Sequence, residues 1–140
     1  MSVKYEYKNI PIKGGGFVTG FVFSDKFKDI MYARTDIGGV YRFDFSNNKW
    51  ISLIDDVKAT DSNRCYPIGI ALDENIKGRL YIACGDHISG SLYISDDFGA
   101  TYIKKEIPCA VHGNFVGRSA GERLIKKDGV LYFASQTEGL

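Results

Sequence analysis

The sequence predicts an all-β fold made of repeated four-stranded antiparallel sheets. Three observations predict it: short apolar segments are separated by turn residues, one strand pattern recurs along the chain, and the composition includes 16 Gly, 9 Tyr and 9 Phe beside one Trp. Glycine-punctuated, aromatic-rich segments are typical of β architectures. The 140 residues are 44% hydrophobic and 25% charged, which is the balance of a soluble globular domain.

The first copy of the pattern contains four expected strands, at 20–23, 31–33, 39–44 and 49–51. Polar segments separate them: residues 25–29 begin and end with Asp, and residues 46–48 are Ser-Asn-Asn. Asp and Asn accept the dihedral angles of tight turns. We therefore expect each copy to fold as one small antiparallel unit.

A second copy follows at 69–72, 80–82, 90–96 and 101–103, and a third begins at 121–124 and 130–134. Matched residues lie 49 to 52 positions apart: Gly20 aligns with Gly69 and then with Gly121, and Gly39 aligns with Gly90. Self-similarity at a fixed period is the signature of a repeat architecture.

Four antiparallel strands in a repeat of about 40 to 50 residues form the blade of a β-propeller. The chain is predicted to hold about two and a half blades in one domain: blade 1 at about 16–54, blade 2 at about 66–108 and a partial blade 3 at about 118–140. A β-sandwich is the alternative, and the matched aromatic positions favour the propeller. Because such blades cannot close a ring, we expect as partners the remaining blades in cis or other copies of the chain in trans.

Charge and cysteine usage argue against several classes of partner and cofactor. With 18 Lys and Arg against 17 Asp and Glu, nucleic acid and anionic membranes are not expected as partners. No run of about 18 apolar residues is present to cross a membrane, and residues 1–8 lack the apolar stretch of a secretory signal. The three cysteines have no Cys-x-x-Cys spacing and the two histidines are isolated, so we expect no metal and no cofactor.

Residues 95–102, Ser-Asp-Asp-Phe-Gly-Ala-Thr-Tyr, match the Asp-box pattern Ser-x-Asp-x-Gly-x-Thr-Trp with Tyr in the last place. We expect the Ser and Asp side chains to accept backbone N–H groups across the turn between the third and fourth strands. Gly99 is expected to take a positive φ, and Tyr102 to pack inward. The pattern indicates a fold more than an activity.

Asp36 departs from the repeat. The equivalent positions are Gly85 in the second copy and Gln136 in the third, so blade geometry does not require a carboxylate here. Arg34 is two residues away, on the same face of a regular strand, where it can pair with the carboxylate. From the repeat alone a turn residue before glycine is the favoured interpretation, and a functional carboxylate is the alternative.

Five motifs extend over nearly the whole chain. They are Gly-Gly-Gly-Phe-Val-Thr-Gly at 14–20, residues 32–44 with the core Thr-Asp-Ile-Gly-Gly, Trp-Ile-Ser-Leu at 50–53, Ile-Ala-Leu-Asp at 70–73, and residues 117–124. Together, and in this order, they resemble the N-terminal region of glycoside hydrolase family 74. That family comprises xyloglucanases and xyloglucan-oligosaccharide cellobiohydrolases, built from two seven-bladed propellers with the glucan in the cleft between them.

The resemblance implies an N-terminal fragment of a glycoside hydrolase that acts on xyloglucan or a related β-1,4-glucan with inversion of configuration. In that family the Asp at position 36 is the general base, and an Asp of the C-terminal propeller is the general acid. An inverting hydrolase needs both carboxyl groups, so we expect this chain to be inactive alone. The resemblance also implies an extracellular location; a chain without a signal peptide would otherwise be cytoplasmic.

Arg34, Asn114 and Arg118 are the substrate-binding candidates that the motif positions imply. Structural hydrogen-bond donors within and between blades are the alternative for these three residues. Two departures from the family pattern stand out: Phe115 replaces an acidic residue, and residues 55–65 are polar where the family is rich in Trp. The alternative function is a non-catalytic Asp-box propeller segment that serves glycan binding or self-assembly.

Overall fold

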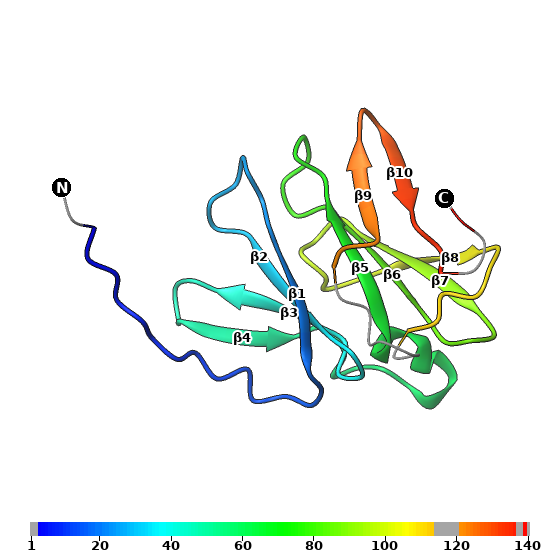
Figure 1. The fold of residues 1–140 in the computed structure, drawn as a ribbon, viewed down its shortest axis with the longest axis horizontal. Coiled ribbons are helices and arrows are strands. Elements are labelled where there is room, and N and C mark those ends of the chain that lie inside the picture. The colour runs from blue at the N-terminus through cyan, green and yellow to red at the C-terminus, as the bar shows by residue number, and fades with distance from the viewer. Residues whose placement is uncertain (1–2, 114–120, 137–138, 140) are drawn as a thin grey trace.

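The computed structural model describes residues 3–113, 121–136 and 139 of the chain. Within these residues the strands form two four-stranded antiparallel sheets and one hairpin, and a short 3-10 helix, η1 (Ala59–Cys65), joins the two sheets (Figure 1). Residues 3–13 run as an extended segment away from the sheets. No helix in the described part of the chain is long and apolar enough to cross a membrane.

Sheet 1 is a four-stranded meander, because polar turns of the expected kind separate its short apolar segments. Its strands are β1 (Val18–Phe23), β2 (Met31–Thr35), β3 (Val40–Asp44) and β4 (Lys49–Ser52). Ser24 Oγ accepts the Phe27 N–H over 2.8 Å in the first turn, and Asp44 Oδ1 accepts the Asn47 N–H over 3.2 Å in the last. Asn48 has a φ of 48°, a left-handed conformation that Asn accepts.

Sheet 2 repeats the same strand order. Its strands are β5 (Pro67–Leu72), β6 (Leu80–Gly85), β7 (Gly90–Ser95) and β8 (Ile103–Ile107). A third unit follows as the hairpin of β9 (Leu124–Lys127) and β10 (Val130–Phe133). These units confirm the all-β fold of four-stranded antiparallel sheets that the repeat predicted.

The strand register corrects the alignment of the third strands by one residue. Ala33 pairs with Tyr41 in sheet 1, as Ile82 pairs with Tyr93 in sheet 2. The second strands are 49 positions apart and the third strands 52, from Tyr41 to Tyr93. The loops at residues 36–39 and 86–89 have equal length, and the additional residues of sheet 2 lie in its longer β6–β7 ladder. The glycine-to-glycine alignment of the third strands was therefore wrong by one residue.

The third copy also begins later than its glycine indicated. Leu124 pairs with Phe133, so β9 starts at Leu124 and Gly121 lies before the strand. The physical reason is the side chain of Glu122, which hydrogen-bonds to both sheets and holds residues 121–122 outside the ladder.

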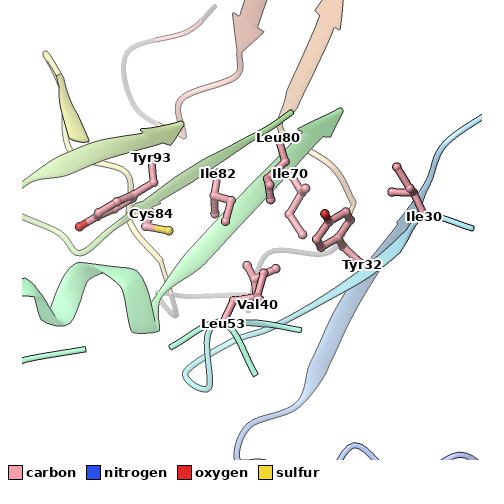
Figure 2. Packing of buried hydrophobic residues seen from close by; sticks show 9 residues of the cluster. All are labelled: Ile30, Tyr32, Val40, Leu53, Ile70, Leu80, Ile82, Cys84 and Tyr93. Atoms are coloured by element: carbon pink, nitrogen blue, oxygen red, sulfur yellow. The ribbon is translucent and has the colours of Figure 1, made fainter. Parts of the chain in front are cut away.

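Two hydrophobic clusters join the three units. The first lies between sheet 1 and sheet 2, and Figure 2 shows its buried members: Ile30, Tyr32, Val40, Leu53, Ile70, Leu80, Ile82, Cys84 and Tyr93. The second lies between sheet 2 and the hairpin, and contains Ile68, Ala71, Tyr81, Ala83, Val111 and Leu124. Full burial of one large apolar side chain contributes about 1.5–3 kcal/mol, so these clusters are the main force that holds the units together.

The units approach one another through their first strands. The close backbone contacts between units are made by β1 and β2 with β5, and by β5 with β9. Successive antiparallel sheets arranged around their first strands have the radial geometry of propeller blades.

The turn at residues 95–102 has the hydrogen bonds expected of it. The N–H groups of Gly99 and Asp97 donate to Ser95 Oγ over 2.8 and 3.2 Å, and the Thr101 N–H donates to Asp97 Oδ1 over 2.8 Å. Gly99 has a φ of 91°, and Tyr102 packs against the first cluster. Hydrogen bonds from the hydroxyl and N–H of Thr101, and from the Ser95 hydroxyl, lower the pKa of Asp97 to about 2.

Candidate functional site

Asp36 lies in the turn at residues 35–39 that joins β2 to β3, here called the Asp36 turn. Its side chain is buried, with 6% of the residue surface exposed. The Phe17 N–H donates to Asp36 Oδ1 over 2.7 Å, and the Asp36 N–H donates to the Phe17 carbonyl oxygen over 3.0 Å. The carboxylate is therefore held by a segment 19 residues earlier in the chain.

Thr35 closes the Asp36 turn from inside. Its N–H donates to the Gly39 carbonyl oxygen over 3.0 Å, and its buried hydroxyl accepts the Gly38 N–H over 2.8 Å. Gly39 takes a φ of 75° and donates its own N–H to the Cys65 carbonyl oxygen over 3.2 Å. The two glycines after Asp36 are thus needed by the geometry of the turn and by its contact with the end of η1.

The glycine run at 14–16 lies against the Asp36 turn. A Cβ at Gly38 would be 2.0 Å from the Gly15 carbonyl oxygen, and a Cβ at Gly14 would be 1.9 Å from the Tyr41 hydroxyl oxygen. The run therefore allows two backbone segments to pack without side chains between them. Sequence reasoning had used these glycines only as a motif and missed their contact with Asp36, because nothing local pairs them with a turn some 20 residues away.

Arg34 is fully buried, with 0% of its surface exposed. Its Nε donates to Glu122 Oε1 over 2.7 Å, its Nη1 donates to Thr19 Oγ1 over 2.7 Å, and its Nη2 donates to the Gly121 carbonyl oxygen. The other oxygen of Glu122 accepts the Ile70 N–H over 2.8 Å. Arg34 and Glu122 therefore join sheet 1, sheet 2 and the start of the third unit, contacts that favour the structural alternative for Arg34.

The remaining sequence-predicted residues are not placed here. Asn114 and Arg118 lie outside the described residues, as does Phe115. Glu122 was not among the candidates, although its position in a motif beside Gly121 was noted; a carboxylate that bridges two sheets leaves no local sequence signal. In the described part of the chain, no group of three or more His, Cys, Asp or Glu side chains is arranged to hold a metal ion.

Exposed apolar side chains flank the buried carboxylate. Phe17, whose backbone holds Asp36, is 63% exposed, and Ile37, at the tip of the turn, is 47% exposed. Phe17 therefore adjoins the Asp36 turn through its backbone hydrogen bonds, and Ile37 through its place in the chain.

The radial four-stranded sheets define the chain as part of a β-propeller. No protein-family model matches the chain. An oligoxyloglucan-reducing end-specific xyloglucanase of Emericella nidulans is 38% identical over 123 residues, which cover 86% of this chain and 15% of that protein. A xyloglucanase of a Paenibacillus species is 39% identical over 146 positions, which cover 97% of this chain and 14% of that protein.

A solved structure agrees with these relatives. The xyloglucanase of glycoside hydrolase family 74 from Xanthomonas campestris superposes with a TM-score of 0.81 at 35% identity, covering 94% of this chain and 20% of that one. The chain is therefore homologous to part of the xyloglucanases of glycoside hydrolase family 74, as the five motifs indicated. It spans 14% to 20% of the length of these relatives.

Proposed function

We propose that the chain is a segment of an inverting glycoside hydrolase that acts on xyloglucan or a related β-1,4-glucan, with Asp36 as the general base. The observation that carries the proposal is the Asp36 turn: a buried carboxylate held by a backbone N–H at a position where the equivalent turn of sheet 2 has Gly85. Support comes from relatives named xyloglucanases that are 38% and 39% identical over most of the chain. The extracellular location implied by the resemblance belongs to the same proposal.

In this mechanism Asp36 takes a proton from the water that attacks the anomeric carbon. A second carboxyl group, about 6.5 to 9.5 Å away, protonates the leaving oxygen from the other face of the sugar. By resemblance this acid belongs to a second propeller, beyond the segment that the 140 residues represent. The chain by itself is therefore proposed to bind glucan weakly and not to hydrolyse it.

A chimera tests the role of Asp36. Residues 1–140 replace the matching segment of the Paenibacillus xyloglucanase, and xyloglucan hydrolysis is measured by the release of reducing ends. Asp36→Asn keeps an oxygen that accepts the Phe17 N–H but cannot accept a proton from water. We expect it to lower kcat by about 10²- to 10⁴-fold, which is the usual contribution of general base catalysis.

The matched control is Asp55→Asn, since Asp55 is exposed in the loop after β4 and its change removes the same charge. We expect the Asp55→Asn chimera to keep its kcat. An Asp36→Asn chimera as active as the unchanged chimera would remove the catalytic role of Asp36.

We also propose a docking role for the outer face of sheet 1, which turns away from sheet 2. This face carries an aromatic cluster in which Phe21 lies 6.0 Å from Trp50 between ring centroids, and Phe43 lies 5.0 Å from Trp50. Phe21 and Phe23 are 50% and 61% exposed. Large exposed apolar patches mark interaction surfaces, and a further repeat of the same kind, in cis or from another copy, is the partner proposed for this one.

Sedimentation of the purified 140-residue chain tests this docking role. We expect a discrete oligomer, and we expect Phe21→Lys to shift it toward monomer. A monomer at all concentrations that also unfolds in one cooperative transition would contradict the proposed docking between copies.

A further inference from the structure

The backbone at Phe17 contacts Asp36 directly. The Phe17 N–H donates to Asp36 Oδ1 over 2.7 Å, and the Asp36 N–H donates back to the Phe17 carbonyl oxygen over 3.0 Å. The bond from the Phe17 N–H fixes the orientation of the Asp36 carboxylate, and the bond from the Asp36 N–H places the backbone of residue 36. Hydrogen bonds from a backbone N–H to a carboxylate are short and strong, so this pair is well suited to hold a reacting group still.

Gly16 is the residue that makes room for this arrangement. It takes a φ of 91°, and a Cβ at this position would lie 2.8 Å from Asp36 Oδ1 and 2.9 Å from the Cβ of Thr35. Any side chain at residue 16 must therefore move the carboxylate or the turn that carries it. The neighbouring Gly15 differs, because a Cβ there would meet nothing within 4 Å.

Sheet 2 supplies an internal comparison, 49 positions further along the chain. There the Gly85 N–H donates to the Tyr66 carbonyl oxygen over 3.1 Å, which repeats the backbone bond between Asp36 and Phe17. The position equivalent to Gly16 is Cys65. Cys65 ends η1 and does not take a positive φ, whereas Gly16 has a φ of 91°. Sheet 2 therefore lacks both the left-handed backbone and the carboxylate that exclude a side chain at residue 16.

We propose that Gly16 and the Phe17 N–H are positioning elements for the Asp36 carboxylate in glucan hydrolysis. The inference rests on the proposed role of Asp36 as general base. Gly16 acts by leaving space, and the Phe17 N–H acts by fixing Oδ1, so that the carboxylate meets the attacking water in one orientation. A general base must lie within hydrogen-bond reach of the proton that it removes, and a misplacement of about 1 Å costs about 10²-fold in rate.

The test compares three glycine-to-alanine changes in the same chimera. Gly16→Ala introduces both the clash with Asp36 and backbone strain, and we expect kcat to fall about 10²-fold while KM stays near its original value. Gly15→Ala changes the adjacent residue without a clash. Gly129→Ala, at a φ of 81° with nothing within 4 Å of the added Cβ, introduces the same kind of strain in the turn between β9 and β10.

We expect Gly15→Ala to keep both kcat and Tm, and Gly129→Ala to lower Tm while keeping kcat. A Gly16→Ala chimera with unchanged kcat, beside an inactive Asp36→Asn chimera, would overturn the positioning inference and leave the proposed base in place. Full activity of Asp36→Asn would instead overturn the proposed function itself.

A second measurement needs no catalysis and uses the 140-residue chain. The Phe17 amide proton is followed by NMR, because a proton in a short hydrogen bond to a carboxylate resonates downfield. We expect an upfield shift in Gly16→Ala and in Asp36→Asn, and no shift in Gly15→Ala. A Phe17 resonance that neither of the first two changes moves would overturn the contact on which the inference depends.

Discussion

The two four-stranded sheets carry equivalent residues in opposite environments. The strand register equates Phe21 of sheet 1 with Ile70 of sheet 2, yet Phe21 is 50% exposed and Ile70 is 1% exposed. Tyr41 and Tyr93 also match and both are buried, with 4% and 2% of their surface exposed, but only Tyr93 belongs to the cluster that packs sheet 2 against sheet 1. The face of sheet 2 that is buried against its predecessor is therefore the face of sheet 1 that has no predecessor among the described residues.

The turns at Asp36 and Gly85 share their backbone hydrogen bonds but differ in the side chain at that position. Asp36 and Gly85 make the same backbone hydrogen bond to the segment before their sheets, over 3.0 and 3.1 Å. At this position a carboxylate is present only in sheet 1; in sheet 2 the position is Gly85, and the carboxylate of that turn, Asp86, comes one residue later and accepts the N–H groups of Ile88 and Ser89. A repeated backbone thus provides the frame, and the proposed general base is one side chain placed on it.

The largest expected effect separates Ile70 from its equivalent Phe21. Ile70→Ala leaves a cavity in the cluster between the sheets and should lower the free energy of unfolding by about 2–5 kcal/mol. In the dissociated chain, at protein concentrations where copies do not associate, Phe21→Ala removes a half-exposed ring and should cost about 1 kcal/mol or less. Urea denaturation followed by circular dichroism measures both values. Equal losses in the free energy of unfolding for the two variants would mean that the outer face of sheet 1 is buried in solution. If the urea midpoint also rises with protein concentration, another copy of the chain buries that face.

A smaller effect tests how Glu122 connects the two sheets. Glu122→Gln removes the charge of one partner of the buried Arg34 guanidinium, and breaking a fully buried ion pair costs about 3–5 kcal/mol. Because the Glu122 side chain is 25% exposed, solvent reduces this loss and we expect about 2 kcal/mol. Thermal unfolding measures the change.

The control for Glu122 is the Arg79 and Asp96 pair, which lies at the surface of sheet 2. We expect Asp96→Asn to leave Tm unchanged, because solvent screens an exposed ion pair. If Glu122→Gln and Asp96→Asn changed Tm equally, the Arg34 and Glu122 pair would not stabilise the contact between the sheets.

The smallest effect concerns the turns that precede the fourth strands. The folded pKa of Asp97 is about 2, below the value of about 3.9 for an unfolded Asp. Asp97 therefore stabilises the fold above about pH 4, and this contribution is lost as the pH falls toward 2. We expect Asp97→Asn to lower Tm at pH 7 and the difference from the unchanged chain to shrink between about pH 4 and pH 2.

Asp44, in the corresponding turn of sheet 1, gives the comparison for Asp97. Hydrogen bonds from the Asn47 side chain, and from the N–H groups of Asn47 and Ser46, lower its pKa. Asp44 lacks the Ser and Thr hydroxyls that hold Asp97, so Asp44→Asn should change Tm less at pH 7. A larger loss at Asp44 would show that the Asp-box pattern adds nothing to this kind of turn.

The sequence predicted features that depend on neighbouring residues. Strand positions follow from alternating apolar residues and from Asn, Asp and Gly at turns, and the Ser95 to Tyr102 turn follows from contacts within a few residues. Comparison of the copies showed that Asp36 departs from the repeat, but by itself it favoured a turn residue; the catalytic assignment came from the family resemblance. The start of the third copy was misplaced, since a glycine marked it and strand pairing did not.

By itself the sequence determined the repeat, its four short strands and the departure from the repeat at Asp36. Only the tertiary structure decided that Arg34 is buried against Glu122, 88 residues away, and that Phe17 holds Asp36 from 19 residues away. The reason is that strand and turn preferences act over a few neighbouring residues, whereas these contacts exist only after separate sheets have packed together. No local pattern records which distant backbone N–H will face a given side chain.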